Sequence, residues 1–176
     1  MKLRKCISGG QTGADQTGVE CAAALGLETG GTMPKGFRTN VGPMPEWAKK
    51  YGLTEHHDSS YVPRTRQNAK DGDVTVWFGE TTSPGYYCTK KACKDWGKKM
   101  FDNPNLETLR MLSETYEVWN VAGNRAETNK NVVALVKIAF RTLFGKFCSC
   151  CFGTECDLHK RGGYVTKDDE VPSGKE

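Results

Sequence analysis

The chain has 176 residues, of which 37% are hydrophobic and 26% are charged, and its formal net charge at pH 7 is +4. That length allows one globular core, while the lack of an apolar run of about 18 residues and of a signal-peptide core argues against a membrane partner and for a cytoplasmic protein. The mild positive charge suits an anionic small molecule and does not call for nucleic acid, and the eight cysteines are expected to be thiols or metal ligands.

Strand-like and helix-like segments alternate along most of the chain, which predicts an α/β fold with a mostly parallel sheet flanked by helices. The clearest strand covers residues 73–78, which are rich in β-branched and aromatic side chains. In chain order, strands are expected at residues 3–8, 28–32, 73–78, 99–101 and 116–123, and helices at 13–25, 45–51, 64–70, 86–97, 105–113 and 131–143. We expect residues 1–145 to form one domain and residues 146–176 to form a Cys-rich, polar C-terminal extension.

The first predicted strand ends in a glycine-rich turn, Gly9-Gly10-Gln11-Thr12-Gly13, and a helix follows. Glycines let the chain turn sharply and let a ligand approach the backbone, and the free N–H groups at a helix start favour an anion. The turn is neither a P-loop nor a G-x-G-x-x-G dinucleotide fingerprint. It predicts a site for a phosphate-bearing or oxyanionic small molecule, with Gln11 and Thr12 as additional donors. A capped turn without a ligand is the alternative.

Charged residues near the predicted strand ends are further candidates for ligand contacts. Asp15 either caps the helix start or accepts a hydrogen bond from a ligand hydroxyl, since it would repel a phosphate. Lys35 and Arg38 lie in a turn-rich loop and suit a polyanion, although a solvated loop explains them equally well. Arg64 and Arg66 are two residues apart and cannot share a helix face, so we expect one to point to the ligand and the other to solvent.

Two later turns resemble the first one in position. One precedes the helix expected at residue 86, and the other follows the strand expected at 116–123. Parallel strands place such turns on one edge of the sheet, so together they predict a single pocket. Plain helix capping is the alternative for each turn alone. The additional contacts are expected from Thr82, Ser83, Gly85, Thr89, Asn120, Gly123 and Arg125.

Thiols and an imidazole are concentrated after the last predicted helix. These are typical zinc ligands, but their spacing matches no standard zinc finger. Free thiols on an extension and lipid-modified cysteines are the alternatives. The candidate zinc ligands are Cys148, Cys150, Cys151, Cys156 and His159.

Five segments occur in the order in which a known family has them: residues 8–15, 30–36, 64–73, 81–89 and 120–125. Over about residues 3–144, the chain resembles the putative molybdenum carrier family, a YpsA-related branch of the SLOG superfamily of ligand binders. The resemblance implies a Rossmann-like sheet, a ligand pocket at the strand ends and a homo-oligomer, either a dimer or a tetramer. It also implies a first wall at residues 9–13 with Asp15, and further contacts from Arg64, Asn68, Ser83 and Gly85. Pro84 departs from the doubled glycine of the family and removes one N–H donor.

The leading hypothesis is a small-molecule binding protein for a nucleotide or a nucleotide-derived, phosphorylated compound, with a molybdenum cofactor among the candidates. Such a protein could be a carrier, a sensor or a sponge for a nucleotide signal. No nucleophilic triad or phosphoribohydrolase motif is visible, but a nucleotide-processing hydrolase or glycosidase that uses Asp15 or Glu80 is one alternative. A zinc-containing interaction module is another. The hypothesis predicts that Gly10→Val blocks the ligand and leaves the fold intact.

Overall fold

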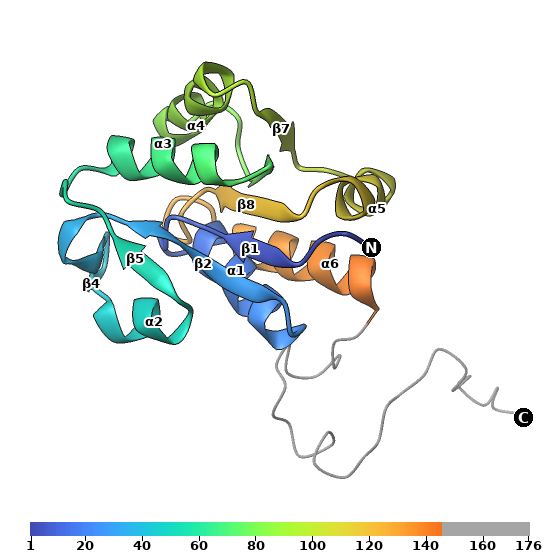
Figure 1. Ribbon diagram of the computed structural model, residues 1–176, viewed down its shortest axis with the longest axis horizontal. Coiled ribbons are helices and arrows are strands. Elements are labelled where there is room, and N and C mark those ends of the chain that lie inside the picture. Colours follow the sequence, from blue (N-terminus) through green and yellow to red (C-terminus); the bar gives the residue numbers. More distant parts are fainter. Residues whose placement is uncertain (146–176) are drawn as a thin grey trace, which may run out of the picture.

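The computed structural model describes residues 1–145, which form a central parallel sheet with helices on both faces (Figure 1). The strands of this sheet are β1 (Lys5–Ile7), β2 (Glu28–Met33), β5 (Leu53–Glu55), β6 (Val74–Phe78), β7 (Lys99–Asp102) and β8 (Val118–Gly123). The helices are α1 (Ala14–Ala24), α2 (Pro45–Lys50), α3 (Tyr61–Asp71), α4 (Pro84–Asp95), α5 (Leu106–Thr115) and α6 (Val132–Phe144). A separate antiparallel pair, β3 (Arg38–Thr39) and β4 (Gly42–Pro43), follows a short 3-10 turn, η1 (Lys35–Phe37).

The strand order β5-β2-β1-β8-β6-β7 brings three strand ends together near the middle of the sheet. The chain runs outward from β1 to β2 and β5, crosses to β6 and β7, and returns as β8 between β1 and β6. The connections after β1 and after β6 therefore leave in opposite directions. Open α/β sheets bind ligands at such a switch point, beyond the carboxyl ends of the strands.

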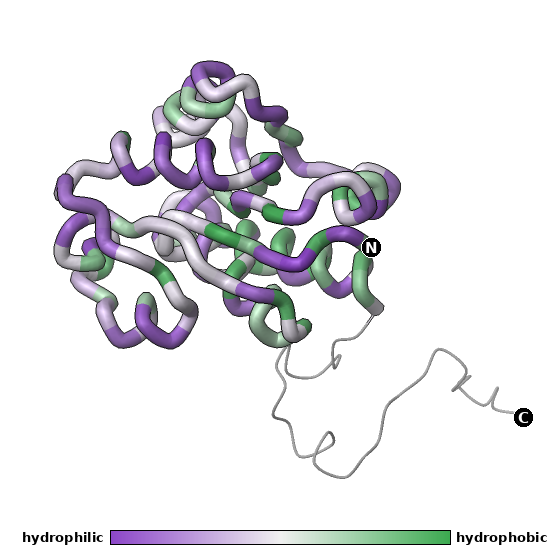
Figure 2. Tube along the Cα trace, viewed as in Figure 1, coloured by the Kyte–Doolittle hydropathy of each residue, from purple (hydrophilic) through white to green (hydrophobic). Residues whose placement is uncertain are grey.

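The main hydrophobic core lies on the sheet face that α1, α5 and α6 cover. Successive side chains of a strand point to opposite faces, so Val74, Val76 and Phe78 of β6 enter this core together with Trp119 and Val121 of β8. In Figure 2, α1 and α6 behind the sheet include hydrophobic stretches, whereas α3, above the strands in this view, is mostly hydrophilic. Burial on this side supplies most of the apolar contact that holds the sheet.

The opposite face of the sheet, under α3 and α4, is more polar. The intervening residues of β6 and β8 point to it, and they include Thr75, Trp77 and Asn120. The buried apolar cluster on this side is small and consists of Ala69, Ala92 and Cys93. Because few large apolar side chains fill the space between these helices and the sheet, a ligand can enter there.

The structure confirms the predicted Rossmann-like α/β fold, with a parallel sheet flanked by helices. Strand β5 and the β3–β4 pair were not predicted, because each is short and lacks the alternating pattern of a longer strand. Helix α3 begins at Tyr61 rather than at Arg64, since Pro63 lies in its first turn, where a proline removes no helical hydrogen bond. None of the helices within residues 1–145 has the length and apolar character to span a bilayer. The C-terminal extension lies outside the described residues.

Candidate functional site

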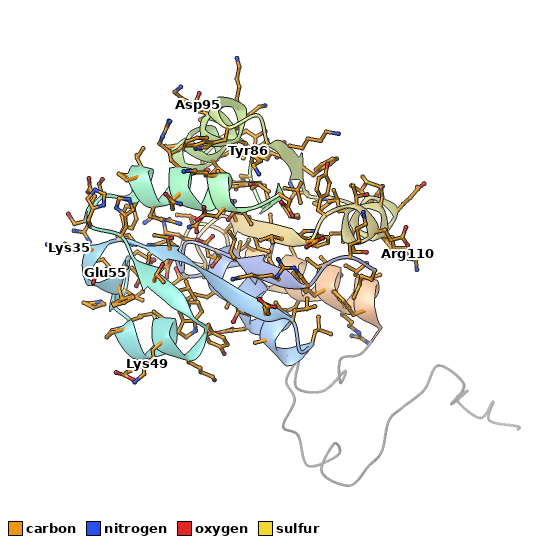
Figure 3. The ribbon with its side chains drawn as sticks, in the orientation of Figure 1. Lys35, Lys49, Glu55, Tyr86, Asp95 and Arg110 are labelled. Carbon is orange, nitrogen blue, oxygen red and sulfur yellow. The ribbon has the colours of Figure 1, made fainter. Side chains whose placement is uncertain are left out.

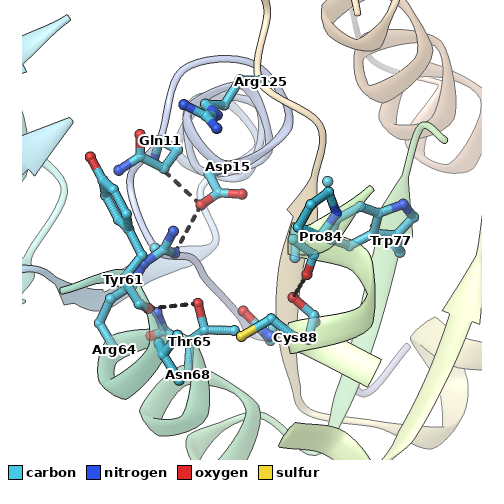
Figure 4. A pocket seen from close by; sticks show the side chains of 17 residues that line it. Gln11, Asp15, Tyr61, Arg64, Thr65, Asn68, Trp77, Pro84, Cys88 and Arg125 are labelled. Carbon is cyan, nitrogen blue, oxygen red and sulfur yellow. Dashed lines mark hydrogen bonds and ion pairs between the residues drawn. The ribbon is translucent and has the colours of Figure 1, made fainter. Parts of the chain in front are cut away.

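A cavity of about 290 Å³ opens at the switch point, between the sheet edge and the N-terminal halves of α3 and α4. Figure 4 shows side chains from α3 along one side and from β6 and α4 along the other, with the first glycine turn and Arg125 closing one end. The predicted contact residues that line the cavity are Gly9, Gln11, Asp15, Arg64, Asn68, Gly85, Thr89, Asn120, Gly123 and Arg125. The three turns therefore meet at one site, as their positions after parallel strands predict.

An ion pair between Arg64 and Asp15 forms the most buried charged contact of the cavity. Nη1 of Arg64 lies 3.3 Å from Oδ2 of Asp15, and the two side chains are 12% and 7% exposed. The backbone N–H of Gln11 donates to the same Oδ2 at 3.3 Å, and the backbone N–H of Gly9 also donates to the carboxylate. Two amides of the glycine turn are thus engaged by a carboxylate of the chain itself. Figure 4 marks the contacts of Asp15 with Gln11 and Arg64.

Residue 9 has no room for a side chain, because the Arg64 guanidinium lies directly against its backbone. A Cβ at residue 9 would lie 1.2 Å from Nη1 of Arg64. The ring of Tyr61, one turn earlier on α3, lies 5.7 Å from Cζ of Arg64 and gives it a cation–π contact. Nε of Arg64 is buried and has no hydrogen-bond partner within the described residues. One donor of this guanidinium is therefore left over in the wall of the cavity.

The environment of Asp15 changes its acidity. Burial raises the pKa of the Asp15 carboxyl above its ordinary value, and the charge of Arg64 and the hydrogen bonds from Gln11, Arg64 and Gly9 oppose this shift. The carboxyl therefore takes up a proton at a higher pH than an exposed aspartate does. A buried acid with a raised pKa in a cavity is a common feature of functional sites.

The wall on the α4 side presents aromatic and ring surfaces. Trp77 of β6 packs edge-on against Tyr86 with ring centroids 5.3 Å apart, and its Nε1 donates to the carbonyl of Glu80 at 3.2 Å. Pro84 is the first residue of α4, and Oγ of Ser83 caps the helix by accepting the N–H of Tyr86 at 3.2 Å. Proline fits this position because an N–H there would have no helical acceptor.

Asparagine side chains lie at the floor of the cavity and are held in fixed orientations. Oδ1 of Asn68 accepts the backbone N–H of Thr32 at 2.8 Å and its Nδ2 donates to the carbonyl of Thr32 at 2.9 Å, so β2 fixes the orientation of the amide. Nδ2 of Asn120 donates to Oγ1 of Thr75 at 3.0 Å. The thiol of Cys93 donates to the same oxygen at 3.2 Å. Oδ1 of Asn120 is thus the end of that side chain that stays available to a ligand.

Asn124 joins the three turns and was not among the predicted site residues. Its carbonyl accepts the N–H of Ala14 at the start of α1 at 3.1 Å, and its Oδ1 accepts the N–H of Glu80. Its Nδ2 donates to Oγ of Ser83 at 3.4 Å. An asparagine directly after a strand-ending glycine was the sequence signal for this role, since its short amide can satisfy backbone groups of neighbouring turns.

Tyr61, Trp77 and Cys88 also line the cavity without having been predicted as contacts. The signal for Trp77 was its alternation with Val76, which assigns it to the face of Thr75. Tyr61 carried no such signal, because the start of α3 was placed too late. Cys88 comes from the inner side of α4, where burial raises the pKa of its thiol.

Other predicted contact residues lie outside the cavity lining. Gln11, by contrast, does line the cavity, and its side-chain amide holds the carbonyl of Arg38 and the N–H of Asn40 at 3.3 and 3.2 Å. The Thr12 hydroxyl contacts Oε2 of Glu127 at 2.8 Å. Arg38 lies over the Tyr61 ring at 5.7 Å. The remaining residues of this group are Gly10, Gly13, Lys35, Thr82 and Ser83.

The expectation that Gly10→Val leaves the fold intact is wrong. Gly10 has a φ of 70°, and a Cβ there would lie 2.7 Å from Sδ of Met33, a fully buried residue. A valine would therefore strain the backbone and press into the core between α1 and β2 instead of entering the cavity. Gly9 is the glycine of this turn that faces the cavity.

Lys35 is exposed and lies at the periphery of the molecule (Figure 3). The predicted zinc ligands Cys148, Cys150, Cys151, Cys156 and His159 lie outside the described residues. Within residues 1–145, no group of three or more His, Cys, Asp or Glu side chains could hold a metal ion.

Comparisons with known proteins found one similar solved structure and one matching protein family. A solved structure of a putative molybdenum carrier protein from Syntrophus aciditrophicus SB is similar to it with a TM-score of 0.71 and 28% sequence identity, over 81% of this chain and 96% of that chain. No curated protein matches it closely enough to add a further relative. The model of the circularly permutated YpsA SLOG family matches residues 6–144, and the chain belongs to this family.

Proposed function

We propose that the chain binds a nucleotide or a nucleotide-derived, phosphorylated compound and releases it unchanged. The observation that carries this proposal is the buried guanidinium of Arg64, which lines a cavity at the switch point of the sheet and whose Nε has no hydrogen-bond partner within the described residues. Arginine is suited to phosphate and carboxylate groups because its planar donors match their oxygens. A cavity of this position and chemistry is the usual binding site of an open α/β sheet.

The walls of the cavity fit an aromatic ring better than a chain-like ligand. Tyr61 lies on the α3 side and Trp77 with Pro84 on the α4 side (Figure 4). These flat apolar surfaces favour a planar base or pterin. Oδ1 of Asn120 offers an acceptor for a ring N–H, and it keeps this orientation because Thr75 holds the other end of the amide.

The positive groups at the cavity fit the anionic part of such a ligand. Arg64 is buried in the wall, and Arg125 is exposed in the turn after β8 and lines the same cavity. Asp15 is the one carboxylate among the lining residues of the described chain. Two cations against one carboxylate leave a surplus of positive charge for a phosphate.

A molybdenum cofactor is one candidate cargo, and the printed name of the structural neighbour supports including it. The aromatic walls suit a pterin ring, and Arg64 with Arg125 suits its phosphate. Cys88 is the one thiol in the lining, so the described residues offer no ligand set for a bare metal ion. We therefore propose that any molybdenum enters within an anion, either an organic cofactor or an oxyanion, and not as a bare metal ion. Carrier, sensor and sponge roles all use this same binding step, and the homo-oligomer and the cytoplasmic location stay predictions.

Native mass spectrometry of the purified full chain, followed by calorimetry with a panel of nucleotides, tests the proposal. We expect an intact ligand mass or a nucleotide that binds, and we expect Arg64→Ala to weaken its binding by about 1.5–3 kcal/mol because a hydrogen bond to a charged group is lost. Arg66→Ala is the matched control, since Arg66 pairs with Asp95 outside the cavity. Equal affinities of both variants would place the site elsewhere, and a chemically altered ligand would favour the hydrolase alternative.

A further inference from the structure

Asp15 occupies the place in the glycine turn where a ligand anion would be expected. Its carboxylate accepts the N–H of Gln11 at 3.3 Å and is also hydrogen-bonded by the N–H of Gly9. Nη1 of Arg64 completes this set of donors at 3.3 Å. Backbone amides at a strand-to-helix turn and an arginine are the groups that proteins use to hold a phosphate. Here they converge on a side chain of the same protein.

The geometry leaves no room for a second anion on the same donors. Arg64 lies so close to Gly9 that a Cβ there would lie 1.2 Å from Nη1, and the Asp15 side chain is only 7% exposed. Both residues nevertheless line the cavity, so movement of either side chain can open the donors to it. An anion that reaches the two amides must therefore take the place of the Asp15 carboxylate.

We propose that Asp15 is an internal competitor for the anionic group of the ligand, which displaces the carboxylate from Arg64 and from the amides of Gly9 and Gln11. This inference rests on the proposed function and adds to it a control of affinity. A ligand with one weak contact leaves the Arg64–Asp15 pair in place. A compact, multiply charged oxyanion such as a phosphate replaces each of the lost hydrogen bonds. The site therefore selects for such groups.

The proposal predicts a pH dependence whose sign follows from the charges around Asp15. The groups that face it are Arg64 from α3 and the amides of its own turn, while Arg125, Tyr61 and Cys88 line the same cavity. Protonation of Asp15 removes the competing charge and frees Arg64, so an anion binds more tightly as the pH falls. Burial raises the pKa of Asp15, so this change begins at a higher pH than for an exposed aspartate.

Sulfate is a suitable probe because its charge stays constant where aspartates titrate. Titrations of the full chain between about pH 5 and about pH 8, followed by calorimetry and by Trp fluorescence, compare the wild type with Asp15→Asn. We expect Asp15→Asn to bind sulfate about tenfold more tightly at the upper pH, equivalent to about one pKa unit of interaction, and to lose most of the pH dependence. The wild type should approach the variant as the pH falls. Asp95→Asn is the matched control, because Asp95 pairs with Arg66 outside the cavity.

The contrary outcomes separate this inference from the proposed function. Weaker binding by Asp15→Asn would show that the carboxylate supports the bound ligand, and it would overturn the competition while the binding function stands. A wild-type affinity that does not change with pH would do the same without relying on a variant. No sulfate binding by any variant across the range would also overturn the inference, and nucleotide calorimetry then decides the proposed function on its own.

Discussion

Helix α3 supplies the arginines of two arginine–aspartate pairs, which differ in contact distance and in burial. Nη1 of Arg66 lies 2.7 Å from Oδ2 of Asp95, and the two side chains are 42% and 28% exposed. Nη1 of Arg64 lies 3.3 Å from Oδ2 of Asp15, and the two side chains are 12% and 7% exposed. The shorter contact is on the outer surface, where Asp95 is labelled in Figure 3, and the longer one lines the cavity.

This comparison shows that burial rather than contact distance decides what an ion pair does. Water screens the Arg66–Asp95 pair, and exposed pairs of this kind contribute little to stability. The Arg64–Asp15 pair is removed from water, so each charge depends on its partner and on the surrounding hydrogen bonds. Arg64 and Arg66 are two residues apart, which places their side chains about 200° apart around the helix axis. The two arginines therefore reach different surroundings.

The two pairs should differ most in the free energy of unfolding that is lost when the arginine of each pair is replaced by alanine. Arg64→Ala leaves the buried carboxylate of Asp15 without its cation, and we expect a loss of about 3 kcal/mol in the free energy of unfolding at about pH 8. Arg66→Ala should change it little. Urea denaturation followed by circular dichroism measures both, and equal effects would refute the distinction between the two pairs.

A second prediction moves Arg64 without removing it. Gly9→Ala adds a methyl group where Nη1 of Arg64 lies, and it needs no unusual backbone angle because Gly9 is not among the positive-φ glycines. We expect nucleotide affinity to fall about tenfold, or ~1.4 kcal/mol, in calorimetry. Gly30→Ala is the matched control, since its Cβ would press at 3.3 Å on the flexible end of Lys5, away from the cavity. A similar loss in the control would show a general packing effect.

The two aspartates should respond to pH in opposite directions. Burial raises the pKa of Asp15 in the fold, so its contribution to stability is complete at acid pH and is lost as the pH rises through its folded pKa. Hydrogen bonds from Arg66 and Lys91 lower the pKa of Asp95, so its contribution is present above its ordinary pKa and is lost as the pH falls. In urea titrations at several pH values, Asp15→Asn should gain stability over the wild type as the pH rises. If the stability of Asp15→Asn relative to the wild type fell as the pH rose, that result would contradict the raised pKa of Asp15.

The smallest effect should come from the aromatic ring of Tyr61, which contacts both Arg64 and Arg38. Tyr61→Leu removes the ring that lies 5.7 Å from Cζ of Arg64 and keeps an apolar side chain in its place. We expect a loss of about 0.5–1 kcal/mol in unfolding free energy, the lower part of the range for cation–π contacts, because Tyr61 is only partly buried. Thermal denaturation of Tyr61→Leu beside the wild type checks this, and an unchanged midpoint would limit Tyr61 to a role in lining the cavity.

Much of the fold was predictable because long segments carry their own signals. Strand β6 is an uninterrupted β-branched and aromatic segment, and α6 shows a helical apolar stripe, so both were located within a few residues. Short elements such as β5 have no such pattern, and their pairing to β2 supplies what their sequence lacks. The start of α3 was missed because Pro63 is equally compatible with a loop and with a first helical turn.

The site was predictable in its position and only partly in its chemistry. The sequence by itself determined that three glycine-containing turns follow parallel strands, and sheet geometry then requires that they meet at one edge. Only the tertiary structure decided which side chains point into the cavity. It also decided that the amides of Asn68 and Asn124 hold neighbouring backbone in place, and that Asp15 fills the glycine turn. The physical reason is that hydrogen-bond partners distant in sequence are set by packing, which a local pattern of residues does not encode.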